Sequence, residues 1–216
     1  MKSHVLGWAT LGLLLNGPTL PVLGRQAPSW PDHIDRREAT YRGGFIAPAL
    51  PKPRFVLLDT SGALFDFWAR TQGSVTLLFF GYTGCPDQCP LHMATIGTAL
   101  KTMPTGLTDQ VKLVFVTVDP SRDTPAVLRR WLDHFDNRFI GLTGSEGAIE
   151  AARRAAGIPA VRNAGAPGGS YGVSHQNVVL AYTKDNYAHV IYPGGFRKDD
   201  WVHDLPLLVK ETWSRP

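Results

Sequence analysis

The sequence predicts an α/β domain with a central mixed sheet flanked by helices. Two continuous apolar runs, 74–82 and 111–118, have the composition of strands that are buried on both faces. Helical patterns alternate with these strands, and two β-rich runs near the C-terminus are spaced as an antiparallel hairpin. Helices that alternate with buried strands indicate a parallel centre, and the closing hairpin makes the sheet mixed.

Length and composition fit one ordinary folded domain. A chain of 216 residues can bury a self-sufficient core, and 44% hydrophobic residues favour neither disorder nor a polytopic membrane protein. The formal net charge is +4, and the basic residues are scattered without a run. We therefore expect no nucleic-acid partner, because such a partner calls for a clustered basic face.

The first 24 residues have the features of an export signal. Lys2 is followed by an uncharged apolar run at 5–15, and the segment ends in the small residue Gly24. A run of this length has the size of a signal-peptide core and is short for a membrane span. We predict export, with 1–24 either a cleaved signal peptide or a retained N-terminal membrane anchor.

The next segment, 25–53, is rich in proline and polar residues and lacks sustained periodicity, which predicts a tether. The folded domain is then expected at 54–216. It should open with two short strands, 54–59 and 63–67, around a Thr-Ser-Gly turn, as an added N-terminal strand pair.

The remaining elements follow from apolar periodicity and from capping residues. A helix near Pro125 can be capped by Asp123 or Thr124, and Pro206 should either kink the last helix or mark its start. In chain order we predict strand 74–82, helix 86–100, strand 111–118, a helix from 125, helix 145–157, a Gly-rich loop at 162–174, a hairpin of strands 176–182 and 188–192, and a C-terminal helix.

Both cysteines, Cys85 and Cys89, follow the strand 74–82 at the start of the predicted helix. A cysteine pair placed after a central strand, at a helix N-terminus, is the layout of the thioredoxin-like fold. The helix dipole should lower the thiol pKa there, and positions i and i+4 share a helix face, so that the sulfurs can bind one ion or close as a disulfide. A disulfide across so short a loop stabilises little, so a purely structural role is disfavoured.

The spacing of the two cysteines also favours a metal site. Thioredoxin-type redox motifs separate their cysteines by two residues, whereas three residues intervene here. Two thiolates select Cu(I), with Zn(II) as a competitor, and an imidazole would complete the site. His92 is near Cys89 in sequence, and His175 precedes a predicted strand, so the residues alone leave both open. The full set of candidates is His92, His134, His175, His189 and His203.

Three blocks of the sequence resemble the Sco/SenC family, whose members are exported thioredoxin-fold copper proteins that help to assemble cytochrome c oxidase. "FFGYTGCPDQCP" (79–90) is similar to the family signature. "VTVDPSRDTPAVLRRWLDHFDNRFIGLTG" (116–144) and "SHQNVVL" (174–180) are similar to its second and third blocks, in the same order. The likeness runs from about Phe55 to the C-terminus.

The resemblance implies a copper ion, Cu(I) or Cu(II), held by Cys85, Cys89 and His175. It makes Asp123 a secondary candidate near the site, and His92 remains a second one. The sequence departs from the family pattern at Gly84, where histidine is usual, and at Ser174, where aspartate is common. The second departure removes a carboxylate that could orient the imidazole.

The function implied by the resemblance is that of a copper metallochaperone at the periplasmic or extracytoplasmic face of the inner membrane. It would deliver copper to the binuclear copper centre of cytochrome c oxidase subunit II. Its implied partners are that subunit, an exported thiol reductase and other copper chaperones, with membrane association through the N-terminus.

Two other classes of function remain open. In a thiol:disulfide oxidoreductase Cys85 would attack and Cys89 would resolve, which leaves open whether the protein is an enzyme. A copper or redox sensor would use the same residues. A peroxidase is disfavoured, because Tyr82 stands where a peroxiredoxin has threonine.

Overall fold

The computed structural model describes residues 34–35, 41–158, 162–165, 171–174 and 177–213. Their strands are β1 (Ile34–Asp35), β2 (Gly44–Pro51), β3 (Val56–Asp59), β4 (Leu64–Asp66), β5 (Val75–Gly81), β6 (Val111–Thr117), β7 (Ile140–Thr143), β8 (Arg162–Gly165), β9 (Tyr171–Ser174), β10 (Val178–Tyr182) and β11 (Tyr187–Pro193). Their helices are α1 (Phe67–Thr71), α2 (Gln88–Lys101), α3 (Thr105–Thr108), α4 (Pro125–Asp133), α5 (Glu146–Ala155) and α6 (Lys198–Lys210).

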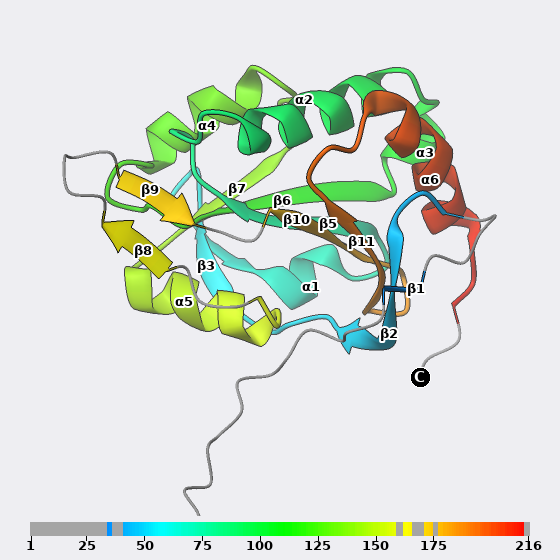
Figure 1. The fold of residues 1–216 in the computed structure, drawn as a ribbon, viewed down its shortest axis with the longest axis horizontal. Coiled ribbons are helices and arrows are strands. Elements are labelled where there is room, and N and C mark those ends of the chain that lie inside the picture. The colour runs from blue at the N-terminus through cyan, green and yellow to red at the C-terminus, as the bar shows by residue number, and fades with distance from the viewer. Residues whose placement is uncertain (1–33, 36–40, 159–161, 166–170, 175–176, 214–216) are drawn as a thin grey trace, which may run out of the picture.

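Nine of the described strands form one sheet in the order β1-β2-β11-β10-β5-β6-β7-β3-β4. The pairs β5–β6 and β6–β7 are parallel, and the other neighbours are antiparallel. Helices α2, α4 and α6 cover one face of the sheet, and α1 and α5 lie on the other (Figure 1). The predicted mixed sheet flanked by helices is therefore confirmed.

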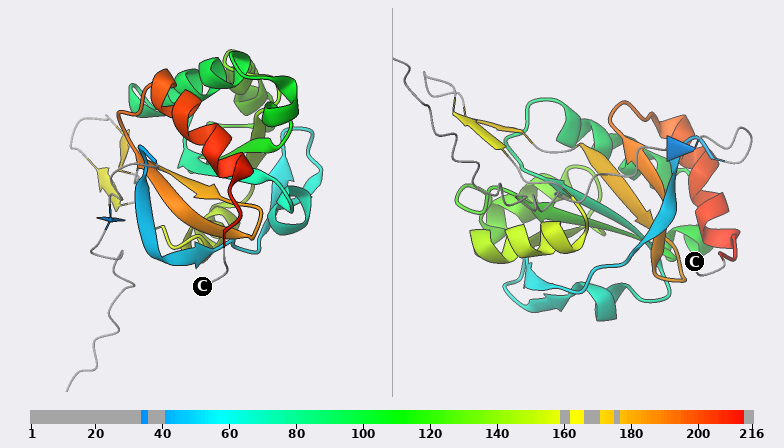
Figure 2. Two further views of the ribbon diagram at one scale, coloured as in Figure 1. Left: turned by 90° about the vertical axis from the view of Figure 1, so that its right-hand side faces the viewer. Right: turned by 60° about the horizontal axis from the view of Figure 1, so that its bottom comes forward.

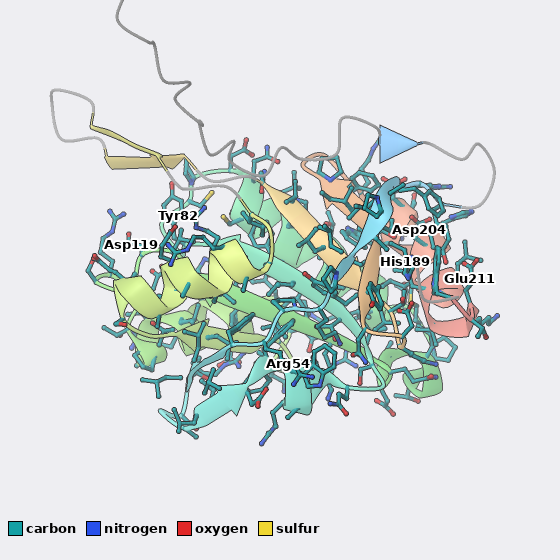
Figure 3. All side chains as sticks on the ribbon, turned by 90° about the horizontal axis from the view of Figure 1, so that it is seen from below. Arg54, Tyr82, Asp119, His189, Asp204 and Glu211 are labelled. Carbon is teal, nitrogen blue, oxygen red and sulfur yellow. The ribbon has the colours of Figure 1, made fainter. Side chains whose placement is uncertain are left out.

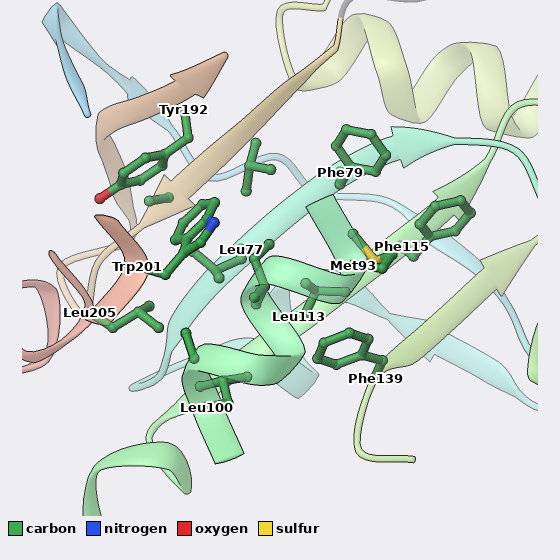
Figure 4. Packing of buried hydrophobic residues seen from close by; sticks show 14 of the residues in the cluster. Leu77, Phe79, Met93, Leu100, Leu113, Phe115, Phe139, Tyr192, Trp201 and Leu205 are labelled. Atoms are coloured by element: carbon green, nitrogen blue, oxygen red, sulfur yellow. The ribbon is translucent and has the colours of Figure 1, made fainter. Parts of the chain in front are cut away.

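The two central strands are the two continuous apolar runs of the sequence. Every residue of β5 is buried, and β6 is buried from Leu113 onward. One core packs α2 and α6 onto the sheet through Met93, Leu100, Trp201 and Leu205, as Figure 4 shows. A second core on the opposite face includes residues of α1 and α5. Burial on both faces explains why these strands show no alternation of apolar and polar residues.

The predicted end of the tether, at residue 53, is wrong, because the folded part begins earlier in the chain. β2 pairs with β11, and Tyr41 is buried in the main core. The folded part therefore includes residues 41–53, which the prediction assigned to the tether. The sequence did not predict this strand, because Pro48 and Pro51 lie in it and proline is rare within sheets except near an edge. β2 lies near an edge, with only the short β1 beyond it among the described strands.

The expected N-terminal strand pair is confirmed as β3 and β4, which form the other edge of the sheet beside β7. β7 itself was not predicted, because a strand of four residues is too short to show a periodic pattern. Figure 2 shows the β3–β4 hairpin beside α1 at one side of the molecule.

Two predictions near the C-terminus need correction. The segment 162–174 was predicted to be a Gly-rich loop, but its two ends pair as β8 and β9, with Arg162 opposite Ser174. Pro206 does not mark the start of the last helix, because α6 already begins at Lys198 and continues past the proline. The predicted hairpin is confirmed as β10 and β11. None of the helices in the described ranges is long and apolar enough to cross a bilayer.

Candidate metal centre

The two cysteines lie where the central strand β5 gives way to α2. β5 ends at Gly81, the loop runs from Tyr82 to Asp87, and α2 begins at Gln88. The helix was predicted to include Pro86, but it starts two residues later, with Asp87 as its N-cap. Cys85 is consequently a loop residue, and only Cys89 lies in the helix. The conformation of the loop brings the two cysteines together, and not a shared helix face, as the sequence suggested.

The structure nevertheless brings the two thiols together. The backbone N–H of Cys89 donates a hydrogen bond to the Cys85 sulfur, with 3.5 Å between N and Sγ. The Cys89 thiol in turn contacts the Cys85 thiol and accepts from the backbone N–H of Tyr82. Both cysteines are reduced thiols, with no disulfide between them. Each sulfur therefore has one backbone N–H directed at it, an arrangement that stabilises negative charge on sulfur.

Burial separates the chemistry of the two thiols. The exposed fraction is 9% for Cys85 and 0% for Cys89. Burial raises the pKa of the Cys89 thiol well above its usual value, and the nearby Cys85 thiol and Asp123 charge add to this rise, while the Tyr82 N–H opposes it. The expectation that the helix N-terminus lowers the thiol pKa is therefore wrong for Cys89. Desolvation of a thiolate outweighs the helix dipole at this depth.

Asp123 is not a helix cap, although the sequence allowed that role. The hydroxyl of Thr124 caps α4 by accepting from the N–H of Val127. The Asp123 carboxylate is buried and accepts from the Thr83 N–H at 2.9 Å, the Thr83 hydroxyl at 2.5 Å and the Thr117 hydroxyl at 2.6 Å. Thr83 lies two residues before Cys85, so this carboxylate fixes the cysteine loop to the end of β6.

Two further polar side chains lie at this end of the molecule. Burial first, and then the charges of Cys85 and Cys89, raise the pKa of Tyr82, the first residue of the loop. Asp119 is buried and accepts hydrogen bonds from Arg122 and Ser121. Figure 3 shows Tyr82 and Asp119 together at one end of the molecule.

His92 faces the protein interior. It lies on the buried side of α2, three residues after Cys89, with an exposed fraction of 1%. Its ring packs against Phe79, with 5.1 Å between ring centroids. The structure therefore places His92 in the protein interior, against Phe79 of β5.

Three other histidines have partners of their own. His134 contacts the Arg130 carbonyl, His189 contacts the Asp185 carboxylate, and His203 contacts Asp204. His189 also stacks on Trp213, with 4.2 Å between centroids. Figure 3 shows His189 and Asp204 at the opposite end of the molecule from Tyr82.

His175, the third predicted ligand, lies outside the described residues. Within the described residues no group of three or more His, Cys, Asp or Glu side chains is arranged to hold a metal ion. The neighbouring described residue on its C-terminal side is Asn177. A Cβ built on Gly194 would lie 3.0 Å from the Asn177 amide nitrogen and 2.6 Å from the Gln88 amide oxygen. The chain that enters β10 therefore passes beside the first turn of α2.

Sequence reasoning missed the contribution of the backbone to this site. The N–H groups of Tyr82 and Cys89 that point at sulfur carry no residue-specific signal, and the Thr83–Asp123 contact joins residues forty positions apart. Only the proximity of Asp123 to the site was anticipated, through the family resemblance.

Comparisons with known proteins agree on one family. A family model described as SCO1/SenC matches residues 46–210. "SCO2-like protein" of Rickettsia felis is 40% identical over 96 residues, which are 44% of this chain and 46% of that protein. "Protein SenC" of Rhodobacter capsulatus is 36% identical over 139 residues, which are 63% of this chain and 62% of that protein. This chain thus spans less than two thirds of the length of either relative.

Solved structures show the same likeness. Apo Sco1 from Thermus thermophilus has a TM-score of 0.69 at 30% identity, covering 80% of this chain and 99% of that one. Bradyrhizobium japonicum ScoI with copper bound has a TM-score of 0.64 at 29% identity, covering 74% of this chain and 99% of that one. These structures confirm the predicted thioredoxin-like fold. Together with the family model, which spans most of the domain, they show that this chain belongs to the SCO1/SenC family.

Proposed function

We propose that this protein is a copper metallochaperone, which binds copper through Cys85, Cys89 and His175 and delivers it to the binuclear copper centre of cytochrome c oxidase subunit II. The observation that carries the proposal is the contact between the two reduced thiols just after the end of β5. Copper is the cargo of this reaction and not a resident cofactor.

The donor set fits copper. Two thiolate sulfurs are soft ligands that select Cu(I), and the backbone N–H groups of Tyr82 and Cys89 would offset the charge of a dithiolate. Because burial keeps the Cys89 thiol protonated, copper must displace a proton when it binds. Copper-bound structures of relatives, such as B. japonicum ScoI, support the choice of metal.

The topology supports His175 as the third ligand. β10 runs antiparallel to β5, with Val179 opposite Phe79, so that the start of β10 lies at the end of β5 that leads to the cysteines. Asn177 lies beside Gln88, the residue before Cys89. A histidine two positions before Asn177 is therefore within reach of the thiol pair, since two extended residues span about 7 Å.

Delivery would proceed by exchange of sulfur ligands. Thiolates of the receiving subunit replace Cys85 and Cys89 on the copper ion one at a time, and the protein is left as a dithiol. Only the dithiol can take up copper, and an oxidising compartment converts such a pair to the disulfide, which implies an exported thiol reductase as partner. Other copper chaperones would supply the metal. The proposal places the protein at the periplasmic or extracytoplasmic face of the inner membrane, with residues 1–24 as signal peptide or anchor.

The test compares His175→Ala with wild type in cells that depend on this protein for oxidase assembly. The substitution should abolish tight copper binding and oxidase activity, while dithiol exchange with glutathione stays close to wild type. Normal assembly of the oxidase in the His175→Ala cells would contradict the metallochaperone function.

One observation favours thiol:disulfide exchange as a second candidate. Cys85 is the more accessible thiol, and the fully buried Cys89 is in direct contact with it. Cys85 could attack a substrate disulfide and release one substrate thiol. Cys89 would then displace the second thiol and close the Cys85–Cys89 disulfide, so that the substrate gains two electrons and two protons. Cys89→Ala should trap the mixed disulfide on Cys85, and failure to trap it would contradict this activity.

A further inference from the structure

Gly81, the last residue of β5, lies directly beneath the Cys89 sulfur. It pairs with Thr117 of β6, and its carbonyl accepts from the Val118 N–H at 2.8 Å. The φ angle of Gly81 is not positive. The backbone conformation therefore permits any residue at this position, and the need for glycine must come from its surroundings.

The surroundings leave no room for a side chain. A Cβ built on Gly81 would lie 2.9 Å from the Cys89 sulfur, 2.6 Å from Cε1 of Phe79 and 3.1 Å from Cε2 of Phe115. Real Cβ atoms essentially never approach other atoms within 3.0 Å. The Cys89 sulfur thus occupies space that the side chain of any other residue at position 81 would fill.

This close approach brings the sulfur to the backbone. The residue after Gly81 is Tyr82, whose N–H donates to the Cys89 thiol. A methyl group at position 81 would move the sulfur away from the strand and weaken that hydrogen bond.

We propose that Gly81 is a positioning residue of the copper site. The absence of its side chain lets Cys89 hold its sulfur against the end of β5, within reach of the Tyr82 N–H and the Cys85 thiol. The inference deepens the proposed copper function, on which it rests. It also predicts that Gly81 affects the equilibrium between dithiol and disulfide, which is measured without any metal.

Two other glycines provide matched controls. A Cβ on Gly141 would be crowded to a similar degree, at 2.7 Å from Leu132, 2.9 Å from Leu128 and 2.9 Å from Thr60, but with no sulfur among these contacts. Gly84 adjoins Cys85, yet a Cβ there would meet only the Tyr82 ring, at 3.7 Å. Gly141→Ala therefore reproduces the crowding without the cysteine, and Gly84→Ala changes the loop without crowding.

The first measurement is Cu(I) affinity. The reduced full chain and the variants Gly81→Ala, Gly84→Ala and Gly141→Ala compete for Cu(I) with the chromophoric chelator bicinchoninate. Gly81→Ala should lose affinity by about tenfold or more, the scale of a lost hydrogen bond to a charged group. Gly84→Ala and Gly141→Ala should stay close to wild type, although Gly141→Ala melts at a lower temperature. Equal affinity of Gly81→Ala and wild type would overturn the inference.

The second measurement needs no metal. The equilibrium between dithiol and disulfide is measured against glutathione. Gly81→Ala should shift it toward the disulfide by about tenfold, or about 30 mV, because the reduced sulfur loses its backbone donor. If wild type fails to bind Cu(I), the proposed function fails, and this shift still decides the role of Gly81. No shift relative to Gly84→Ala would overturn that role.

The Phe79 ring carbon is the closest contact of a Cβ at position 81. If Gly81→Ala fails to fold, both measurements are made on Gly81→Ala combined with Phe79→Leu, against Phe79→Leu alone. The sulfur contact remains in this background, so a loss of affinity and a shifted equilibrium support the inference. Values equal to those of Phe79→Leu contradict it.

Discussion

Two buried carboxylates, Asp123 and Asp204, perform the same structural task in two regions of the molecule. Asp123 accepts from the N–H and hydroxyl of Thr83 and from the Thr117 hydroxyl. Asp204 accepts from the N–H groups of Arg42 and Gly43 and from the Tyr192 hydroxyl. The exposed fraction is 1% for Asp123 and 0% for Asp204. Each fixes a loop or strand end to the sheet, but only Asp123 fixes the loop that carries a cysteine.

Burial and satisfied hydrogen bonds therefore do not by themselves identify a functional residue. What distinguishes Asp123 is its position near Cys89, whose pKa its charge helps to raise. Asp204 joins α6 to the start of β2 and to β11 at the other end of the molecule (Figure 3).

The largest expected effect is on stability, and it should be alike in the two regions. Asp123→Ala leaves one N–H and two hydroxyls without their acceptor, and Asp204→Ala leaves two N–H groups and one hydroxyl. Each substitution should lower the free energy of unfolding by about 3 kcal/mol. Urea denaturation of the reduced, metal-free protein measures it. A cost below about 1 kcal/mol for either variant would show that its carboxylate is not an essential acceptor.

The next effect should separate the two regions. Asp123→Ala releases the Thr83 turn and should weaken Cu(I) binding by about tenfold, whereas Asp204→Ala should leave Cu(I) affinity unchanged in the folded protein. Competition with a Cu(I) chelator, at a temperature where both variants are folded, measures it. Equal losses in both variants would show that Asp123 acts only through global stability.

A smaller effect concerns alkaline pH. The pKa of Cys89 is raised in the folded protein above the value of about 8.5 in an unfolded chain. Below that value both states keep the proton and the contribution to stability is complete. Above it only the unfolded chain releases the proton, so stability falls as pH rises, by up to about 1.4 kcal/mol per pH unit.

The measurement compares wild type with Cys89→Ala, by urea denaturation at neutral pH and about one unit above the thiol pKa of the unfolded chain. The comparison is needed because buried Lys52, whose pKa burial lowers to about 8, has the opposite sign: its contribution to stability increases with pH above that value. An equal pH dependence of the unfolding free energy in wild type and Cys89→Ala would contradict a raised pKa of the Cys89 thiol in the folded protein.

The smallest effect tests which residue caps α4. Thr124→Ala should cost about 1 kcal/mol of unfolding free energy, the usual value of an N-cap, and should leave copper affinity unchanged. Thermal denaturation and chelator competition measure the two quantities. A change in copper affinity would mean that the cap, and not only Asp123, orders the cysteine loop.

The sequence predicted the parts of the fold that depend on local pattern. β5 and β6 are continuous apolar runs, and Ser145 and Gly157 bound α5 as expected. β2 was not predicted, because it contains prolines, which are rare within strands except near the edge of a sheet. Its pairing with β11 also joins distant parts of the chain. Propensity reports local preference and does not reveal such long-range pairing.

The candidate site shows the same limit. The convergence of Cys85 and Cys89 was predicted from their spacing, but for a helical reason that the structure does not support. The role of Asp123 depends on Thr83 and Thr117, and the need for glycine at position 81 depends on a sulfur eight residues away. These are properties of packing, which appear only once the chain is folded.

The most direct test of the central claim is copper loading of the purified, reduced full chain, followed by spectroscopy of the bound metal. Wild type is compared with Cys85→Ala, Cys89→Ala, His175→Ala and His92→Ala. The account predicts one copper ion per chain in wild type, loss of tight binding in both cysteine variants and in His175→Ala, and retained binding in His92→Ala. Loss of binding in His92→Ala together with retention in His175→Ala would contradict the proposed ligand set.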